Sequence, residues 1–222
     1  LARILGWGGA SDAHHLTQPA PDGRGAARAI REATRALEPS QRLPGLIAAH
    51  ATSTPANDAA EYSALSAAFG DRLRDVPVTA LKSRIGHTLG AAGAVELAVV
   101  LAAMEQSKLP AAANAETDGD SFPDLDLLHE GSRTGCVEHA AVVSLGFGGA
   151  DAAILVEAPD VSHPILPHFP GYAAKTSSTQ REMILISGCG VLVPEVGKTP
   201  IRVGELGLDD DALDGIDDAR AV

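Results

Sequence analysis

The chain has 222 residues, of which 45% are hydrophobic, so it can bury a substantial core as one domain or at most two. Its formal net charge of -12 is concentrated at the end, because residues 205–222 hold seven acidic side chains and one arginine. A surface that binds a phosphate backbone needs clustered Lys and Arg, so this balance argues against nucleic acid as a partner.

Three sequence features bear on the cellular location and on the start of the chain: the cysteine content, the first residue and the longest apolar run. Two cysteines, Cys136 and Cys189, are too few for a disulfide framework or a four-cysteine metal site, and they fit a reducing cytosol. No secretory signal opens the chain, and Leu1 stands in place of Met, so we expect the start of the gene product to be missing. The longest apolar stretch, residues 89–104, is interrupted by Glu96, which favours a buried helix over a membrane span. We therefore expect a cytoplasmic protein without a membrane anchor.

Short apolar runs alternate with helical patterns over the first 158 residues. Strands are predicted at residues 2–7, 46–49, 76–81, 140–145 and 152–157. Helices are predicted at residues 24–37, 59–69 and 88–105, and the third is apolar nearly all round, as is typical of a helix between layers. Strands separated by helices and closed by a final strand pair predict a layered α/β unit with a mixed sheet over residues 1–158.

Residues 159–222 do not continue the alternation of strand and helix patterns. Residues 159–180 hold four prolines and a Lys-Thr-Ser-Ser-Thr run with little periodicity, which predicts a linker. Residues 181–222 are predicted to form a partial second unit, with strand candidates at 183–187 and 201–203 before the acidic tail.

The strongest chemical signal is a pair of histidines, His50 and His87, with Lys82 five positions before the second. Each histidine lies among small residues, which let a substrate approach closely. Histidine hydrogen-bonds or exchanges protons near neutral pH, and two imidazoles can hold one oxyanion, which suits decarboxylation. An isolated histidine is more often structural, so the surrounding motifs decide the interpretation.

Three motifs surround the pair: His-Ala-Thr-Ser-Thr at residues 50–54, Lys-Ser-Arg-Ile-Gly-His at 82–87 and Gly-Phe-Gly-Gly at 146–149. In this order they resemble the motifs of β-ketoacyl synthases, the condensing enzymes of fatty acid and polyketide assembly. Residues 4–30 also resemble the start of the C-terminal half of such enzymes. The resemblance covers about residues 1–158 and implies the C-terminal half of a thiolase-like layered fold.

The resemblance implies a decarboxylative Claisen condensation, in which the carbanion formed from malonyl-acyl carrier protein attacks an acyl group held on a cysteine. His50 and His87 would hydrogen-bond the malonyl thioester oxygen, and Lys82 would stay charged and order the site around His87. Glu96 would support this network from the following helix, although a simple ion pair between loop and helix explains Glu96 equally well.

Three further residues are implied in substrate binding. Thr52 and Thr54 match threonines that hydrogen-bond the phosphopantetheine arm of the carrier, with hydroxyl-stabilised turns as the alternative. Phe147 matches a gating phenylalanine, with core packing as the alternative. The resemblance implies no cofactor beyond the carrier arm. It implies the acyl carrier protein and a second ketosynthase chain, in a homodimer or heterodimer, as partners.

Two other patterns are weaker. The adjacent His14 and His15 would diverge on a strand, and no further ligand has suitable spacing, so no metal site is predicted. Arginines recur at helical spacing at positions 24, 28, 31 and 35. They could dock an acidic carrier protein, but a solvated helix face is the favoured interpretation.

The sequence departs from the family pattern near the motifs. Ala51 replaces the usual glycine after the first histidine, and Leu145 replaces a frequent phenylalanine. Ala150 and Asp151 stand where Thr and Asn commonly follow the Gly-Gly. None of these changes removes a group that performs chemistry, but Asp151 adds a negative charge close to the gate and leaves substrate preference open.

A larger departure is the nucleophile. A condensing cysteine needs a helix N-terminus that favours the thiolate, and neither Cys136 nor Cys189 has that context. We therefore expect the cysteine upstream of Leu1 and regard the chain as half an active site. Two alternatives stay open, a different thiolase-fold acyltransferase and a non-catalytic chain-length-factor-like partner, although such partners usually lose the catalytic histidines. Residues 181–194 resemble the first strand and loop of another ketosynthase better than they resemble a dinucleotide-binding loop.

Overall fold

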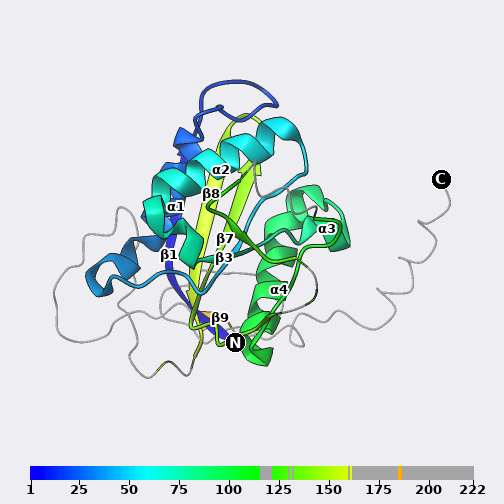
Figure 1. Cartoon of the computed structure of the whole chain (residues 1–222). Coiled ribbons are helices and arrows are strands. Elements are labelled where there is room, and N and C mark those ends of the chain that lie inside the picture. The colour runs from blue at the N-terminus through cyan, green and yellow to red at the C-terminus, as the bar shows by residue number, and fades with distance from the viewer. Residues whose placement is uncertain (116–121, 130, 132, 160, 162–184, 187–222) are drawn as a thin grey trace, which may run out of the picture.

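The computed structural model describes residues 1–115, 122–129, 131, 133–159, 161 and 185–186. A mixed seven-stranded sheet in the order β5-β3-β2-β7-β8-β1-β9 forms the centre of the fold (Figure 1). Its strands are β1 Ala2–Ser11, β2 Leu46–Ala48, β3 Pro77–Thr79, β5 Asp126–Leu127, β7 His139–Gly146, β8 Ala150–Glu157 and β9 Leu185–Ile186. Strands β5, β3, β2 and β7 run parallel, whereas β8 is antiparallel to both β7 and β1. A small separate sheet pairs β4 (Lys108–Leu109) with β6 (Arg133–Thr134).

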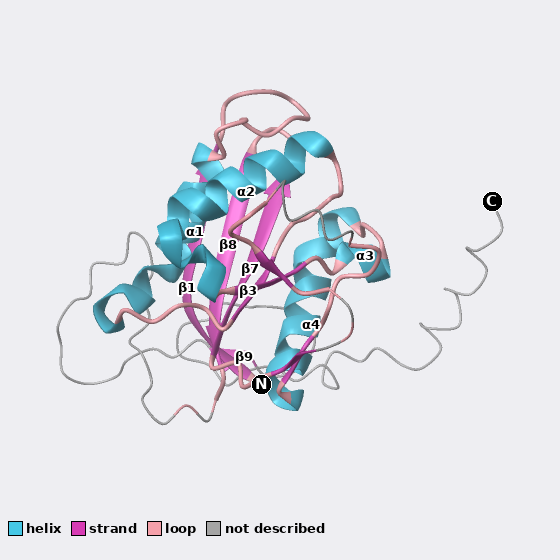
Figure 2. Cartoon of the chain, in the orientation of Figure 1, coloured by secondary structure: helices cyan, strands magenta, loops and turns pink. Residues whose placement is uncertain are grey.

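Helices cover both faces of the large sheet. They are α1 Arg24–Thr34, α2 Pro55–Phe69, α3 Lys82–Ile85 and α4 Ala92–Gln106, with 3-10 turns at Arg35–Ser40, Gly70–Asp75 and Leu89–Ala91. Helices α1 and α2 pack on one face and α4 on the other, as Figure 2 shows. Strand side chains alternate between the two cores: Ile47 lies on the α1 side, while Leu46 and Ala48 lie on the α4 side. This is the layered α/β architecture that the sequence predicts.

Helix α1 lies very close to β1. A Cβ on Gly8 would overlap the backbone carbonyl of Ala29, so only glycine fits at that point of the strand. Ala26, Ile30 and Ala33 fill the rest of the contact from the buried side of α1. The predicted amphipathic helix is therefore present, and its small residues bring it against the sheet.

Several element ends differ from the predicted ones for local reasons. The second helix begins at Pro55 rather than at residue 59, because proline fits the first turn of a helix. The first helix ends at Thr34, and the chain continues as a 3-10 turn that contains Pro39. Residues 82–85, expected in a loop, form the single helical turn α3, and a 3-10 turn precedes α4. Strands β4, β5 and β6 are two residues long, too short to give a periodic signal.

The segment 89–106 is long and apolar enough to cross a membrane by length and composition, a test that the core helix of a soluble protein also passes. One side of the segment packs as a core helix. Val100 and Leu101 belong to the core on the α4 side, and Glu96 on the same helix is fully buried. That side is buried as predicted, although only 28% of the segment is covered by the described residues.

The predicted second unit is described at residues 185–186 alone, which form β9 and pair antiparallel with Ala2 and Arg3 of β1. Most of the predicted linker and the rest of the second unit, including Cys189, lie outside the described residues. The division at residue 158 stays a prediction.

Candidate active site

The carboxyl ends of parallel strands present the predicted motifs at one edge of the sheet. His50 comes two residues after β2, and Lys82 comes three residues after β3. Phe147 follows β7, whose carboxyl end lies at the same edge because β7 is parallel to β2. In open α/β sheets this edge is where ligands bind. The topology thus gathers three motifs that are far apart in the chain.

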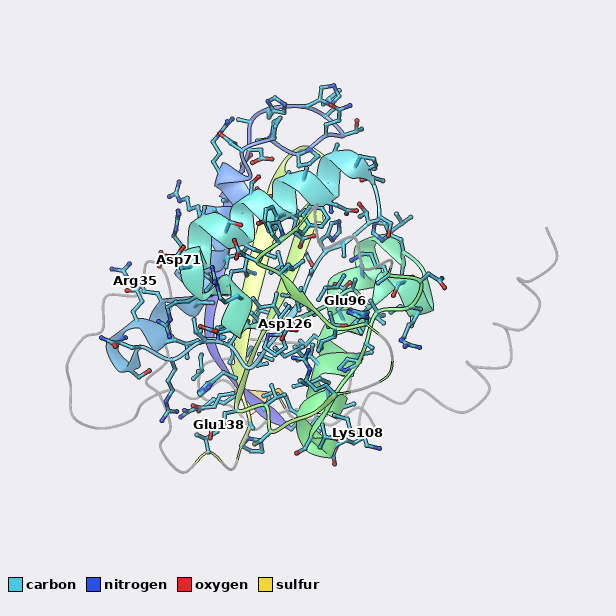
Figure 3. The ribbon with its side chains drawn as sticks, viewed as in Figure 1. Arg35, Asp71, Glu96, Lys108, Asp126 and Glu138 are labelled. Atoms are coloured by element: carbon cyan, nitrogen blue, oxygen red, sulfur yellow. The ribbon has the colours of Figure 1, made fainter. Side chains whose placement is uncertain are left out.

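His50, Lys82, His87 and Glu96 form one connected group. Lys82 Nζ lies 3.3 Å from His50 Nδ1 and 2.5 Å from Glu96 Oε1. The ring centroids of His50 and His87 are 5.5 Å apart, and the rings are nearly perpendicular at 84°. His50, Lys82 and Glu96 are buried, the last on α4 (Figure 3), whereas His87 is exposed. The structure brings together the three residues predicted to be catalytic and the one predicted to support them.

The hydrogen bonds indicate which ring nitrogens hold protons. An ammonium can only donate, so Lys82 makes Nδ1 of His50 the acceptor and leaves the ring proton on Nε2. The backbone N–H of Leu89 donates to Nδ1 of His87 over 3.2 Å, with the same consequence for that ring. Each neutral imidazole then presents an Nε2–H donor, and two such donors can hold one developing oxyanion.

Burial keeps His50 neutral. The pKa of His50 is lowered from 6.5 to about 3, chiefly by burial, further by the charge of Lys82, and also by the repulsion that a protonated His87 would exert. Burial also raises the pKa of Glu96, while the hydrogen bond and charge of Lys82 lower it. Oε2 of Glu96 has no hydrogen-bond partner among the described residues, so Lys82 is the group that compensates this buried carboxylate.

A sequence profile described as the C-terminal domain of β-ketoacyl synthase matches residues 1–116. The chain belongs to the β-ketoacyl synthase family. It is 38% identical over 151 residues to 3-oxoacyl-[acyl-carrier-protein] synthase 2 of Synechocystis sp., which covers 68% of this chain and 36% of that protein. It is also 38% identical over 161 residues to the ketoacyl synthase alpha subunit of the Streptomyces glaucescens tetracenomycin polyketide synthase, covering 71% of this chain and 37% of that one.

Solved ketosynthases share the fold. A type II polyketide ketosynthase, solved with its acyl-carrier protein and a bound hexaketide, matches with a TM-score of 0.63 and 29% identity over 71% of this chain and 38% of that one. The ishigamide ketosynthase/chain length factor matches with a TM-score of 0.61 and 31% identity over 71% of this chain and 38% of that one. These likenesses confirm the predicted thiolase-like fold. The chain spans a little over a third of the length of the relatives it matches.

Glu61 is a site residue of this family member that the sequence analysis missed. From α2, its Oε1 accepts the backbone N–H of His50 at 2.6 Å and its Oε2 accepts that of Ala51 at 2.7 Å. These bonds hold a loop in which Ala51 and Ser53 adopt left-handed backbone angles, with φ of 39° and 60°. Burial raises the pKa of Glu61 to about 7. An acidic residue in the middle of the helix after the first histidine was the available signal.

The predicted substrate-binding residues are exposed or half-buried. The hydroxyl oxygens of Thr52 and Thr54 are 3.0 Å apart. Thr54 is the residue before α2, yet its hydroxyl does not cap that helix. Phe147 is 78% exposed in the turn between β7 and β8, so it does not pack in the core formed by the described residues. Contact of any of the three with substrate stays a prediction.

The structure also shows where the arginines of α1, the paired histidines and Cys136 lie. The arginines at positions 24, 28, 31 and 35 are all exposed, and Arg24 pairs with Asp22 while Arg31 donates to the backbone of α2. His15 accepts hydrogen bonds at Nδ1 from the backbone N–H groups of residues 17 and 18. Cys136 is exposed between β6 and β7, away from any helix start. Within the described part of the chain, no group of three or more His, Cys, Asp or Glu is arranged to hold a metal ion.

Proposed function

We propose that the chain supplies the two-histidine part of a β-ketoacyl synthase active site. The reaction would be decarboxylative Claisen condensation of malonyl-acyl carrier protein with an acyl thioester, in fatty acid or polyketide synthesis. The observation that supports it best is the perpendicular His50–His87 pair, in which each Nδ1 accepts a hydrogen bond and each Nε2 is left to donate. The printed names of the relatives, 3-oxoacyl-[acyl-carrier-protein] synthase and ketoacyl synthase, support the same reaction class.

The first step breaks the bond between the malonyl α-carbon and its carboxylate. Carbon dioxide leaves, and the electron pair moves into the thioester to form an enolate. Two Nε2–H donors aimed at the thioester oxygen stabilise the enolate more than the neutral carbonyl, which lowers the barrier. Because the pKa of His50 is lowered to about 3, its ring is neutral at neutral pH and donates a hydrogen bond from Nε2 without first taking up a second proton. Lys82 holds the ring in that tautomer.

The second step joins the enolate carbon to the carbonyl carbon of an acyl group and expels a thiolate. That acyl group needs a cysteine to hold it, and exposed Cys136 lacks the helix N-terminus that favours a thiolate. Because the relatives are much longer than the matched part, we propose that a segment outside this chain supplies the cysteine. The apolar segment 89–106 is 28% buried here, which leaves apolar surface for such a segment to cover.

Partners follow from the same chemistry. We propose that Thr52 and Thr54 contact the phosphopantetheine arm of the acyl carrier protein, with no separate cofactor, and that Phe147 gates entry to the site. A matched ketosynthase was solved with its acyl-carrier protein, and others with a chain length factor, which supports a carrier partner and a homodimer or heterodimer. The linker at 159–180, the second unit at 181–222 and a cytoplasmic location remain predictions.

Co-expression with the N-terminal remainder of the Synechocystis relative tests the proposal. The assay follows β-ketoacyl product from malonyl- and acyl-carrier protein. We expect product from the native chain and a loss of about 100-fold in His50→Ala and His87→Ala. His15→Ala, which removes an exposed histidine outside the group, is the matched control and should keep full activity.

Two results would overturn the proposal. One is equal activity of the native chain and both histidine variants, which would favour the chain-length-factor-like alternative. The other is no product from the native chain while the relative's own C-terminal part is active in the same co-expression.

A further inference from the structure

Asp12 and Asp151 form a buried carboxyl pair beside the turn that carries Phe147. Asp12 directly follows β1, and Asp151 is the second residue of β8. The antiparallel register pairs Ser11 with Ala150, so these two carboxyl groups become neighbours although they are far apart in the chain. Their residues are only 4% and 5% exposed.

Each of the two carboxyl groups has one oxygen that lacks a partner. Oδ1 of Asp12 and Oδ2 of Asp151 accept no hydrogen bond from the described residues, whereas Oδ2 of Asp12 accepts the backbone N–H of Ala20 at 2.7 Å. The two unpartnered oxygens converge, because a Cβ on Gly25 would collide with both. Two buried acceptors in one small space need a donor, and a carboxyl that keeps its proton is such a donor.

The surroundings favour one negative charge on the pair rather than two. Gly25 is in the first turn of α1, where the N-terminal end of the helix dipole is positive. Arg24 in the same turn donates to the backbone oxygen of Asp12 at 3.0 Å and pairs with Asp22. The guanidinium of Arg24 therefore bonds to the backbone of Asp12 and to Asp22, and not to the carboxyl pair. The positive end of α1 is then the group available to stabilise a negative charge on the pair, and we expect it to stabilise one carboxylate.

The pair lies where the loop 12–20 meets the turn 146–149. Two backbone hydrogen bonds join these segments, Asp12 N–H to Gly149 O at 2.9 Å and Gly148 N–H to Leu16 O at 2.7 Å. The other ionisable side chains of the loop are two exposed histidines at positions 14 and 15, and the turn has none. Because both histidines are exposed, the carboxyl pair is the buried titrating element at this junction.

We propose that Asp12 and Asp151 share one proton at neutral pH and act as a clasp that holds the turn 146–149, and with it Phe147, against the loop 12–20. Loss of the shared proton would place two negative charges in one buried space, and their repulsion would release the turn. Burial and the proximity of Asp12 raise the pKa of Asp151 to about 7, in agreement with this geometry. The clasp is closed below neutral pH and opens above it.

Hydrogen exchange on the full chain tests the clasp. The protection factors of the Asp12 and Gly148 amides, corrected for the intrinsic pH dependence of exchange, should fall about tenfold or more from about pH 6 to about pH 8.5. In Asp151→Asn the amide can donate to Asp12 at every pH, so protection should stay constant. Asp75→Asn, which changes an exposed acid at the end of the 3-10 turn Gly70–Asp75, outside this junction, should behave as the native chain does.

Equal protection of the native chain at both pH values, or the same fall in Asp151→Asn, would overturn the proposal. A carbon-13 titration of the two side-chain carboxyls in the native chain needs no variant. We expect one carboxyl to keep its proton until about neutral pH while the other ionises well below it. Ionisation of both below about pH 5 would also overturn it. Neither readout depends on condensing activity.

Discussion

Replacing Glu61 with glutamine should alter how the stability of the chain depends on pH. In the native chain, burial raises the pKa of Glu61 from 4.5 to about 7, although the N–H groups of Ala51 and His50 lower it in part. A difference of about 2.5 in pKa corresponds to about 3 kcal/mol. Because the folded-state pKa is the higher one, this stabilisation is complete below about pH 4.5 and is lost as the pH rises through about 7.

Glutamine does not titrate. Protonated Glu61 and glutamine each offer one carbonyl oxygen to the two backbone N–H groups of the loop. At about pH 5 we therefore expect Glu61→Gln and the native chain to have unfolding free energies within about 1 kcal/mol of each other. By about pH 8 the native chain has lost about 3 kcal/mol that the variant keeps, so the variant should be the more stable of the two.

Urea unfolding of the full chain at several pH values from about 5 to about 8 measures both curves. Glu105→Gln, which changes an exposed acid on α4, is the matched control for the loss of one charge and should follow the native curve. A native-minus-variant difference that stays constant or grows as the pH rises would refute the reasoning.

Three further predictions concern the ion pair, the carrier arm and the packing of α1. Lys82→Met should cost about 3–5 kcal/mol of unfolding free energy, because it leaves Glu96 buried without its cation, and adding Glu96→Gln should recover most of the loss; urea unfolding that shows no coupling between the two changes would contradict this. In the co-expressed assembly, Thr54→Val should raise KM for malonyl-acyl carrier protein about tenfold with kcat unchanged, and steady-state kinetics with an unchanged KM would argue against an arm contact. Gly8→Ala should lower the free energy of unfolding by about 3 kcal/mol, because its Cβ meets the α1 backbone, whereas Gly90→Ala, with open space around it, should stay within about 0.5 kcal/mol; equal effects would show that the close approach is wrong.

The grouping of His50, Lys82 and His87 could be predicted because it depends on topology and not on fine packing. Each motif follows a short apolar run, and the carboxyl ends of neighbouring parallel strands meet at one edge whatever the exact helix bounds. The resemblance of three motifs in order then identified the family, and the fold and the family matches confirm it.

Glu61 and the Asp12–Asp151 pair could not be predicted, because each depends on which way an element faces. Helix α2 has apolar residues around most of its circumference, so the sequence does not show which side Glu61 presents to the sheet. The two aspartates meet only through the register of β1 with β8, and a register one residue different would turn one of them to the opposite face.

A long-range proton–nitrogen NMR spectrum of the imidazoles tests the central claim most directly, because the proposed chemistry needs both rings neutral with Nε2–H donors. At about pH 8 we expect the Nε2–H tautomer for both His50 and His87. Since its pKa is lowered to about 3, His50 should keep that neutral form down to about pH 5. Protonation of His50 near pH 6.5, or a proton on Nδ1 of either ring at pH 8, would contradict the account.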